Sequence, residues 1–174
     1  MPDIVRNGDL TYKQRIDLIK RSLLINGIDL IGEKPLDNSF YRFDTIISGR
    51  RISLNILPKN IVNSGWSDKP LIKRIQVQSF KMEEIDINKS DLCSMFVGFA
   101  YANESPIFVV WNPFMFVYHK TVRSCYVDVE LIARCQHEGF VKTTSSKQKV
   151  LLSDVEHFGE MILKYVEDNR IETI

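Results

Sequence analysis

The chain has 174 residues, of which 44% are hydrophobic and 26% are charged, and it carries 23 Lys and Arg against 22 Asp and Glu. These proportions are typical of a soluble globular domain, and they exclude a disordered tail, a collagen-like repeat and a disulfide-stabilised miniprotein. The formal net charge of +1 lacks the basic excess that most nucleic-acid-binding chains carry.

The bulk features favour a cytoplasmic protein with no membrane association. The N-terminus, MPDIVRNGDLTYKQR, has no apolar stretch behind its charges, so it is not a signal peptide. The most apolar stretch, residues 106–117, contains Asn and Pro and is too short to span a bilayer. The three cysteines are odd in number and form no Cys-x-x-Cys pair, which favours a reducing compartment.

The first predicted element is a helix over about Leu10–Asn26. Thr11 and Gln14 have the spacing of a capping box, and Gly27 follows where a C-terminal cap is expected. The segment GEKPLDNS (32–39) reads as a loop.

Two predicted hairpins follow. Residues 41–47 and 51–57 flank a turn at Ser48-Gly49-Arg50, and the second strand alternates apolar and polar residues. A loop then leads to a strand in IKRIQVQSF (72–80). Residues 93–101 and 106–111 form the second hairpin, and their nearly continuous apolar sequence indicates a barrel interior or a sheet covered on both faces.

The remaining elements are short. Strands are predicted at 114–119 and 124–127, then a helix over about 128–137 capped by Gly139, and then a hairpin of 140–144 with 149–152. The last helix is expected to start at Ser153 or Asp154, both good N-caps, with Glu156 in its first turn.

This order of elements predicts an α+β fold, a mostly antiparallel β pseudobarrel with three flanking helices. We expect a single domain over residues 1–174, with the helix of residues 1–30 as an appendage and a barrel core at 40–166. The acidic last segment is compatible with a chain cut from a longer protein.

The charge is distributed unevenly along the chain. Residues 50–82 hold seven Lys or Arg and one Asp, for a net charge of +6, and residues 105–149 have a net charge of +3. Residues 83–104 and 150–174 each have a net charge of −4, and residues 1–49 are neutral. The near-neutral total is therefore a sum of opposed segments.

The basic segment 50–82 is a candidate nucleic-acid surface, because it combines cations for phosphates, amides for base edges and an aromatic ring at its centre. The alternative is that these cations only solvate strand faces and protect sheet edges. The candidates are Arg50, Arg51, Lys59, Asn60, Asn63, Trp66, Lys69, Lys73, Arg74 and Gln76.

Trp111 ends a strongly apolar strand before Asn112-Pro113. Core packing is the expected role of its indole, and the alternative is a base-binding pocket with Tyr118 and Tyr126 nearby.

The sequence predicts no cofactor, metal site or catalytic residue. Cys125, His119, Cys135 and His137 lack the spacing of zinc ligands, and no Walker loop or Gly-x-Ser-x-Gly motif occurs. A metal-dependent nuclease would have to use Asp44, Asp128 or Glu130, but no Asp/Glu-x-Lys follows either of the last two.

Several segments resemble the N-terminal specificity domains of restriction endonucleases, including modification-dependent Mcr-type enzymes. They are RRISLNILPKNI, KRIQVQSF, FVGFAYANESPIFVVWNPF and KVLLSDVEHFGEMILKYV, within residues 40–166. The resemblance implies a pseudobarrel that binds duplex DNA through two arms, with cleavage, and any Mg²⁺, in another domain or subunit. Residues 50–74 would belong to one arm, and the other would use Lys120, Arg123, Lys142 and Lys147.

The sequence is consistent with three functions. The first is a sequence- or modification-specific DNA-binding domain of a restriction system used in phage defence, with a nuclease or NTPase as partner. The second is a small Mg²⁺-dependent restriction nuclease. The third is a non-catalytic domain that binds a protein partner or RNA.

Overall fold

The structure is a computed structural model that describes residues 2–77, 91–113, 123–145 and 148–172; the side chains of residues 123 and 169–172 are not described. The helices are α1 (Tyr12–Ile25), the 3-10 turn η1 (Asp37–Ser39), α3 (Val129–Glu138) and α4 (Phe158–Glu172). The strands are β1 (Val5–Asn7), β2 (Asp29–Pro35), β3 (Tyr41–Ile47), β4 (Arg50–Asn60), β5 (Val62–Asn63), β6 (Ile72–Val77), β7 (Leu92–Ala102), β8 (Ser105–Trp111), β9 (Arg123–Asp128), β10 (Phe140–Ser145) and β11 (Gln148–Ser153).

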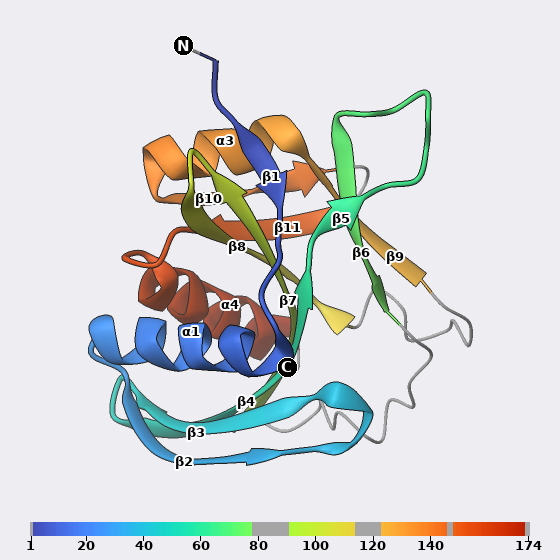
Figure 1. The fold of residues 1–174 in the computed structure, drawn as a ribbon. Helices are drawn as coiled ribbons and strands as arrows, with labels where there is room; N and C mark the ends of the chain where they lie inside the picture. The colour runs from blue at the N-terminus through green and yellow to red at the C-terminus, as the bar shows by residue number, and fades with distance from the viewer. Residues whose placement is uncertain (1, 78–90, 114–122, 146–147, 173–174) are drawn as a thin grey trace.

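A large, mostly antiparallel sheet forms the centre of the molecule, with strand order β10-β11-β8-β7-β4-β3-β2 (Figure 1). β4 and β7 are parallel over eight residue pairs, and β1 joins the end of β7 that β4 leaves uncovered. The two outermost strands, β10 and β2, do not pair with each other, so the sheet is open. The prediction of a mixed α+β fold is confirmed, whereas the pseudobarrel is not.

β7 is buried on both faces because the large sheet is covered on both sides. Met95 and Val97 point into a core closed by α1 and α4. Phe96 and Ala100, on the opposite face, belong to a second core with α3 and a three-stranded sheet, β5-β6-β9. The continuous apolar sequence of β7 and β8 therefore reflects a sheet between two layers.

The helix predictions are correct for α1 and α3 and wrong for the start of α4. Thr11 and Gln14 form the expected capping box, and α1 lies in the first core rather than beside it, since Ile19 and Leu23 are fully buried. α4 begins at Phe158, because Asp154 caps a separate turn instead: its Oδ1 accepts a hydrogen bond from the backbone N–H of His157 at 2.8 Å.

The strand β2 occupies the region expected to be a loop. It pairs with β3, with a bulge between Leu30 and Gly32, and most of its residues are exposed. An edge strand with one solvated face carries Gly, Lys and Pro, so it lacks the apolar alternation that marks buried strands. The predicted strand at 114–119 lies outside the described residues.

Gly139 joins α3 to β10, and a side chain at this position would destabilise the fold. Its φ is 83°, and an added Cβ would lie 2.4 Å from Nδ1 of His157. We expect Gly139→Ala to lower the free energy of unfolding by about 1–3 kcal/mol in a urea titration. An unchanged unfolding midpoint would show that the turn and the His157 ring adapt freely.

His157 gives the fold a predicted dependence on pH. Its Nδ1 lies 2.7 Å from Oδ1 of Asp154, and this hydrogen bond raises the pKa of His157. A raised pKa stabilises the fold fully below the unfolded value of about 6.5, and the contribution is lost as the pH rises through the folded value. Thermal unfolding should therefore show His157→Gln to be destabilised relative to the native chain at pH 5.5, with the gap closing by pH 9. A gap that is constant with pH would contradict this role.

Candidate nucleic-acid interface

The three-stranded sheet presents opposite faces to the core and to solvent. On β6, Ile75 and Val77 are buried in the second core, whereas Arg74 and Gln76 point outward. Arg74 lies directly opposite Tyr126 of β9 in the antiparallel register. This outer face carries most of the predicted base-contacting groups that remain accessible.

An aromatic–basic cluster, made of Trp66, Lys69, Arg74 and Tyr126, lies on this face. The Trp66 and Tyr126 rings stack with centroids 4.6 Å apart, and Nζ of Lys69 lies over the indole at 4.7 Å. Trp66 is 38% exposed, so part of its ring remains accessible to solvent while Tyr126 and the Lys69 ammonium lie against it.

Arg74 lies beneath the loop that carries Trp66. Its Nη2 is 3.3 Å from the position that a Cβ on Gly65 would take, and its Nη1 is 3.5 Å from Oγ of Ser124. Its buried Nε has no hydrogen-bond partner within the described part of the chain. The guanidinium is thus held in place while most of its hydrogen-bonding capacity stays unused.

The outer edge of β9 is fixed by side chains from neighbouring strands. Gln148 accepts a hydrogen bond from the Tyr126 N–H at 2.7 Å and donates one to the carbonyl of Ser124 at 3.2 Å. The indole Nε1–H of Trp111 donates to the carbonyl of Tyr126 at 3.2 Å. Trp111 is fully buried, so it belongs to the core and not to an open base pocket.

Three residues predicted to contact DNA, Lys73, Asn63 and Asn60, form hydrogen bonds with other residues of the chain. Lys73 is buried, and its Nζ donates to Oδ1 of Asn7 at 2.5 Å and of Asn63 at 3.0 Å. Burial lowers the pKa of Lys73. The Asn60 amide accepts from the N–H of Leu10 at 3.2 Å and donates to its carbonyl at 2.8 Å.

The other basic candidates are spread along the molecule. Arg51 is exposed at the first end of β4, and Arg50 beside it is half-buried. Lys59 lies eight residues further along the strand, about 26 Å away in extended backbone. Burial and the nearby Arg15 lower the pKa of Lys59. Arg15 could not be predicted as part of this surface, because nothing along the chain indicates that residue 15 approaches residue 59.

The second predicted arm is only partly described. Lys142 forms an ion pair with Asp168 at 2.9 Å. Lys120, Lys147 and Tyr118 lie outside the described residues, and so does the side chain of Arg123.

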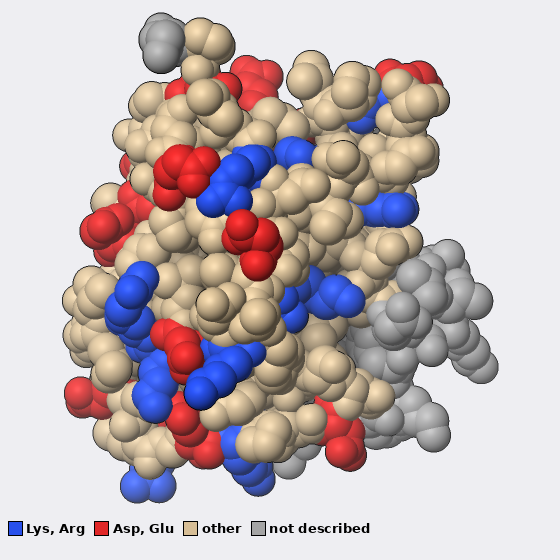
Figure 2. All heavy atoms as spheres, in the orientation of Figure 1, with Lys and Arg blue, Asp and Glu red and all other residues tan. Residues whose placement is uncertain are grey.

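Some cations of the described structure form ion pairs, whereas the described ones of the 50–82 segment form none, and neither do Lys13, Arg21, Lys34 and Lys149. Among the described residues, carboxylates lie within 4.0 Å of Arg6, Lys20, Arg134, Lys142 and Lys164. Within the same described ranges, Arg50, Arg51, Lys59, Lys69, Lys73 and Arg74 have none. Figure 2 shows one face on which acidic and basic groups alternate between wide neutral areas, so this face has no single basic zone.

The acids of the nuclease hypothesis do not form a metal site in the described structure. Asp44 lies on β3, where its Oδ1 accepts a hydrogen bond from the Ser53 hydroxyl at 2.6 Å, whereas Asp128 and Glu130 lie at the junction of β9 and α3. The described residues contain no group of three or more His, Cys, Asp or Glu placed to hold a metal ion.

The three cysteines, Cys93, Cys125 and Cys135, are buried, and burial raises the pKa of the Cys135 thiol to about 12. None of the helices in the described ranges is both long and apolar enough to cross a bilayer.

The chain is thus a mixed α+β domain, and the cations at its outer strand face have no carboxylate partner among the described residues. The family model of the methylase-associated X1 domain matches residues 52–162, and the chain belongs to this family. The matched segment contains the whole aromatic–basic cluster, Lys59 and Gln76. No curated protein and no solved structure matches the chain.

Proposed function

We propose that this chain is a double-stranded DNA-binding domain of a restriction-modification system, which directs an associated methylase or nuclease to its target. Membership of a methylase-associated family supports the system. The main support for DNA as the ligand is that the cations in residues 50–74 have no carboxylate partner among the described residues.

Each cation in this proposal has a defined task. Lys69, Lys59 and Arg51 contact phosphates, because ammonium and guanidinium groups release counterions when they bind the DNA backbone. Arg74 and Gln76 point outward from adjacent positions of one strand face. Arg pairs with guanine and Gln with adenine in the major groove, so these two residues read sequence.

Catalysis belongs to the partner in this account, and any Mg²⁺ is bound there. The system acts on DNA in the cytoplasm, where the buried thiols stay reduced. The domain itself holds DNA and supplies the specificity.

The proposal is tested by fluorescence anisotropy with the full chain and a labelled random duplex, challenged with unlabelled duplex DNA or duplex RNA. We expect DNA to compete at least tenfold better than RNA of the same length. Equal competition by RNA, or no binding at about 50 mM salt, would overturn the proposal.

Base readout is tested separately by selecting bound sequences from a random duplex pool. We expect Gln76→Ala to relax the preference at one base position and to leave the salt dependence unchanged. Selection with fully methylated and unmethylated pools shows whether recognition depends on base modification. A pool that the native chain does not enrich would contradict specific recognition.

A further inference from the structure

The strand pair β10–β11 ends beside β9 and holds it through side chains. Ser145 and Gln148 lie directly opposite each other in the antiparallel register, at the end of this pair of strands. Oγ of Ser145 accepts a hydrogen bond from the N–H of Asp128 at 3.0 Å, and the Gln148 amide bonds to Ser124 and Tyr126. The large sheet is therefore hydrogen-bonded to the edge strand of the three-stranded sheet.

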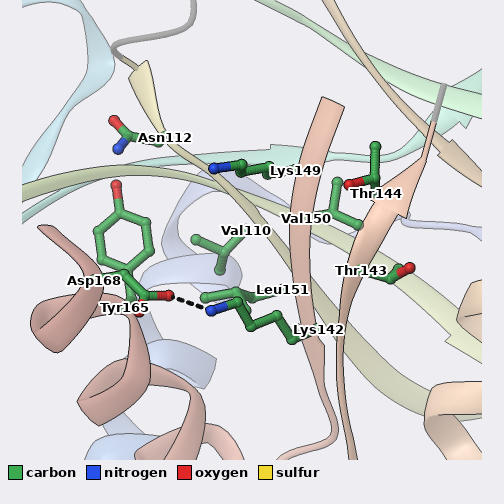
Figure 3. A pocket seen from close by; sticks show the side chains of 10 residues that line it. All are labelled: Val110, Asn112, Lys142, Thr143, Thr144, Lys149, Val150, Leu151, Tyr165 and Asp168. Carbon is green, nitrogen blue, oxygen red and sulfur yellow. Dashed lines mark hydrogen bonds and ion pairs between the residues drawn. The ribbon is translucent and has the colours of Figure 1, made fainter. Parts of the chain in front are cut away.

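The alternation of side chains along β11 points Gln148 toward β9. In Figure 3 Lys149 and Leu151 extend from β11 toward the side on which Tyr165 of α4 lies. Val150, between them, belongs to the second core, which contains β6 and β9. Because successive side chains of a strand point to opposite faces, Gln148 shares the face of Val150.

Gln148 is bonded to the two residues of β9 that lie opposite the proposed base-reading residues. Its amide accepts from the Tyr126 N–H at 2.7 Å and donates to the Ser124 carbonyl at 3.2 Å. In the β6–β9 register, Tyr126 lies opposite Arg74 and Ser124 lies opposite Gln76. Ser124 also contacts Arg74 directly, since its Oγ lies 3.5 Å from Nη1. The placement of both base-reading residues thus depends on a strand whose outer edge Gln148 fixes.

The contacts along this edge of β9 have different reach. Trp111 donates to the carbonyl of Tyr126, and Ser145 holds Asp128, where β9 passes into α3. Within the described ranges, Gln148 is the side chain of the large sheet that bonds to Ser124. Removing its amide should therefore loosen the beginning of β9 while the rest of the strand stays attached.

We infer that Gln148 is a positioning residue for base recognition, because it fixes the backbone of β9 beside Arg74 and Gln76. This inference rests on the proposed function, which assigns base reading to these two residues. It predicts that the Gln148 amide governs specificity and not overall affinity, since the phosphate contacts are assigned to β4 and the loop before β6.

The test measures specificity in the full chain with Gln148→Met, which keeps the length of the side chain but removes both strong hydrogen bonds. The specificity ratio is the Kd for a random duplex divided by the Kd for a duplex selected by the native chain. We expect Gln148→Met to lower this ratio at least fivefold, with the Kd for the random duplex within twofold of native and the salt dependence unchanged. Ser124→Ala, which removes the hydroxyl beside Arg74, should also lower the ratio. Gln136→Ala is the matched control and should not change it, because the Gln136 amide bonds to Asn103.

A measurement without DNA follows the strand itself. Hydrogen exchange of the Tyr126 amide, measured by NMR, should be at least tenfold faster in Gln148→Met than in the native chain, and a thermal scan verifies that the variant is folded. An unchanged specificity ratio in both Gln148→Met and Ser124→Ala, or unchanged Tyr126 exchange in Gln148→Met, would overturn the inference. A failure of the proposed function appears already in the native chain, which would then enrich no sequence, so the two failures are distinguishable.

Discussion

Replacing Trp111 with alanine is expected to lower the free energy of unfolding by about 3–5 kcal/mol, which is the usual cost of truncating a buried Trp. The ring is fully buried between the large sheet and the three-stranded sheet. A Cβ on Gly98 would lie 3.0 Å from its Cζ3, so the backbone of β7 is in close contact with the indole.

Trp66→Ala is the matched control, because it removes the same side chain from an exposed position. This truncation removes the Tyr126 stack and the cation–π interaction with Lys69, which together contribute about 1–2 kcal/mol. Urea unfolding of the two variants measures the difference directly. Equal destabilisation would contradict the assignment of Trp111 to the core and Trp66 to the surface.

The second large effect concerns DNA affinity. Lys69→Gln combined with Arg74→Gln removes two cations of the aromatic–basic cluster and should weaken duplex binding by about 10–100-fold near 0.1 M salt. The loss of Lys69 leaves in place one DNA counterion that the native chain displaces, and the loss of Arg74 removes a base contact. The slope of log K against log salt should become shallower by about 1.

A matched variant separates a local effect of the cluster from an effect of total charge. Lys13→Gln combined with Lys34→Gln makes the same change in net charge at exposed positions on α1 and β2. We expect its DNA affinity to fall less than threefold. If the two double variants weaken binding equally, the cluster has no special role in binding DNA.

Local sequence signals predicted the elements whose ends are determined by residues close together in the chain. The capping box of α1, the hairpin turn at Gly49 and the cap at Gly139 all lie where the sequence predicts them. Pairing between distant segments was not predictable in this way. The parallel contact of β4 with β7 and the addition of β1 to β7 depend on how the whole sheet assembles.

The same distinction between local signals and contacts of distant segments applies to the candidate site. Alternation along β6 puts Lys73 on the face of Ile75 and Val77, so its burial could have been predicted. The stacking of Trp66 on Tyr126 could not, because sixty residues separate them and only the β6–β9 pairing brings them together. The engagement of Asn60 by Leu10 is likewise a contact between distant segments.

The most direct test of the account is the salt dependence of duplex DNA binding by the native chain. Arg51, Lys59 and Lys69 are the phosphate-contacting candidates, which predicts a slope of log K against log salt of about −2 to −3. A slope near zero, or no binding at about 50 mM salt, would contradict the claim that these cations have DNA as their partner.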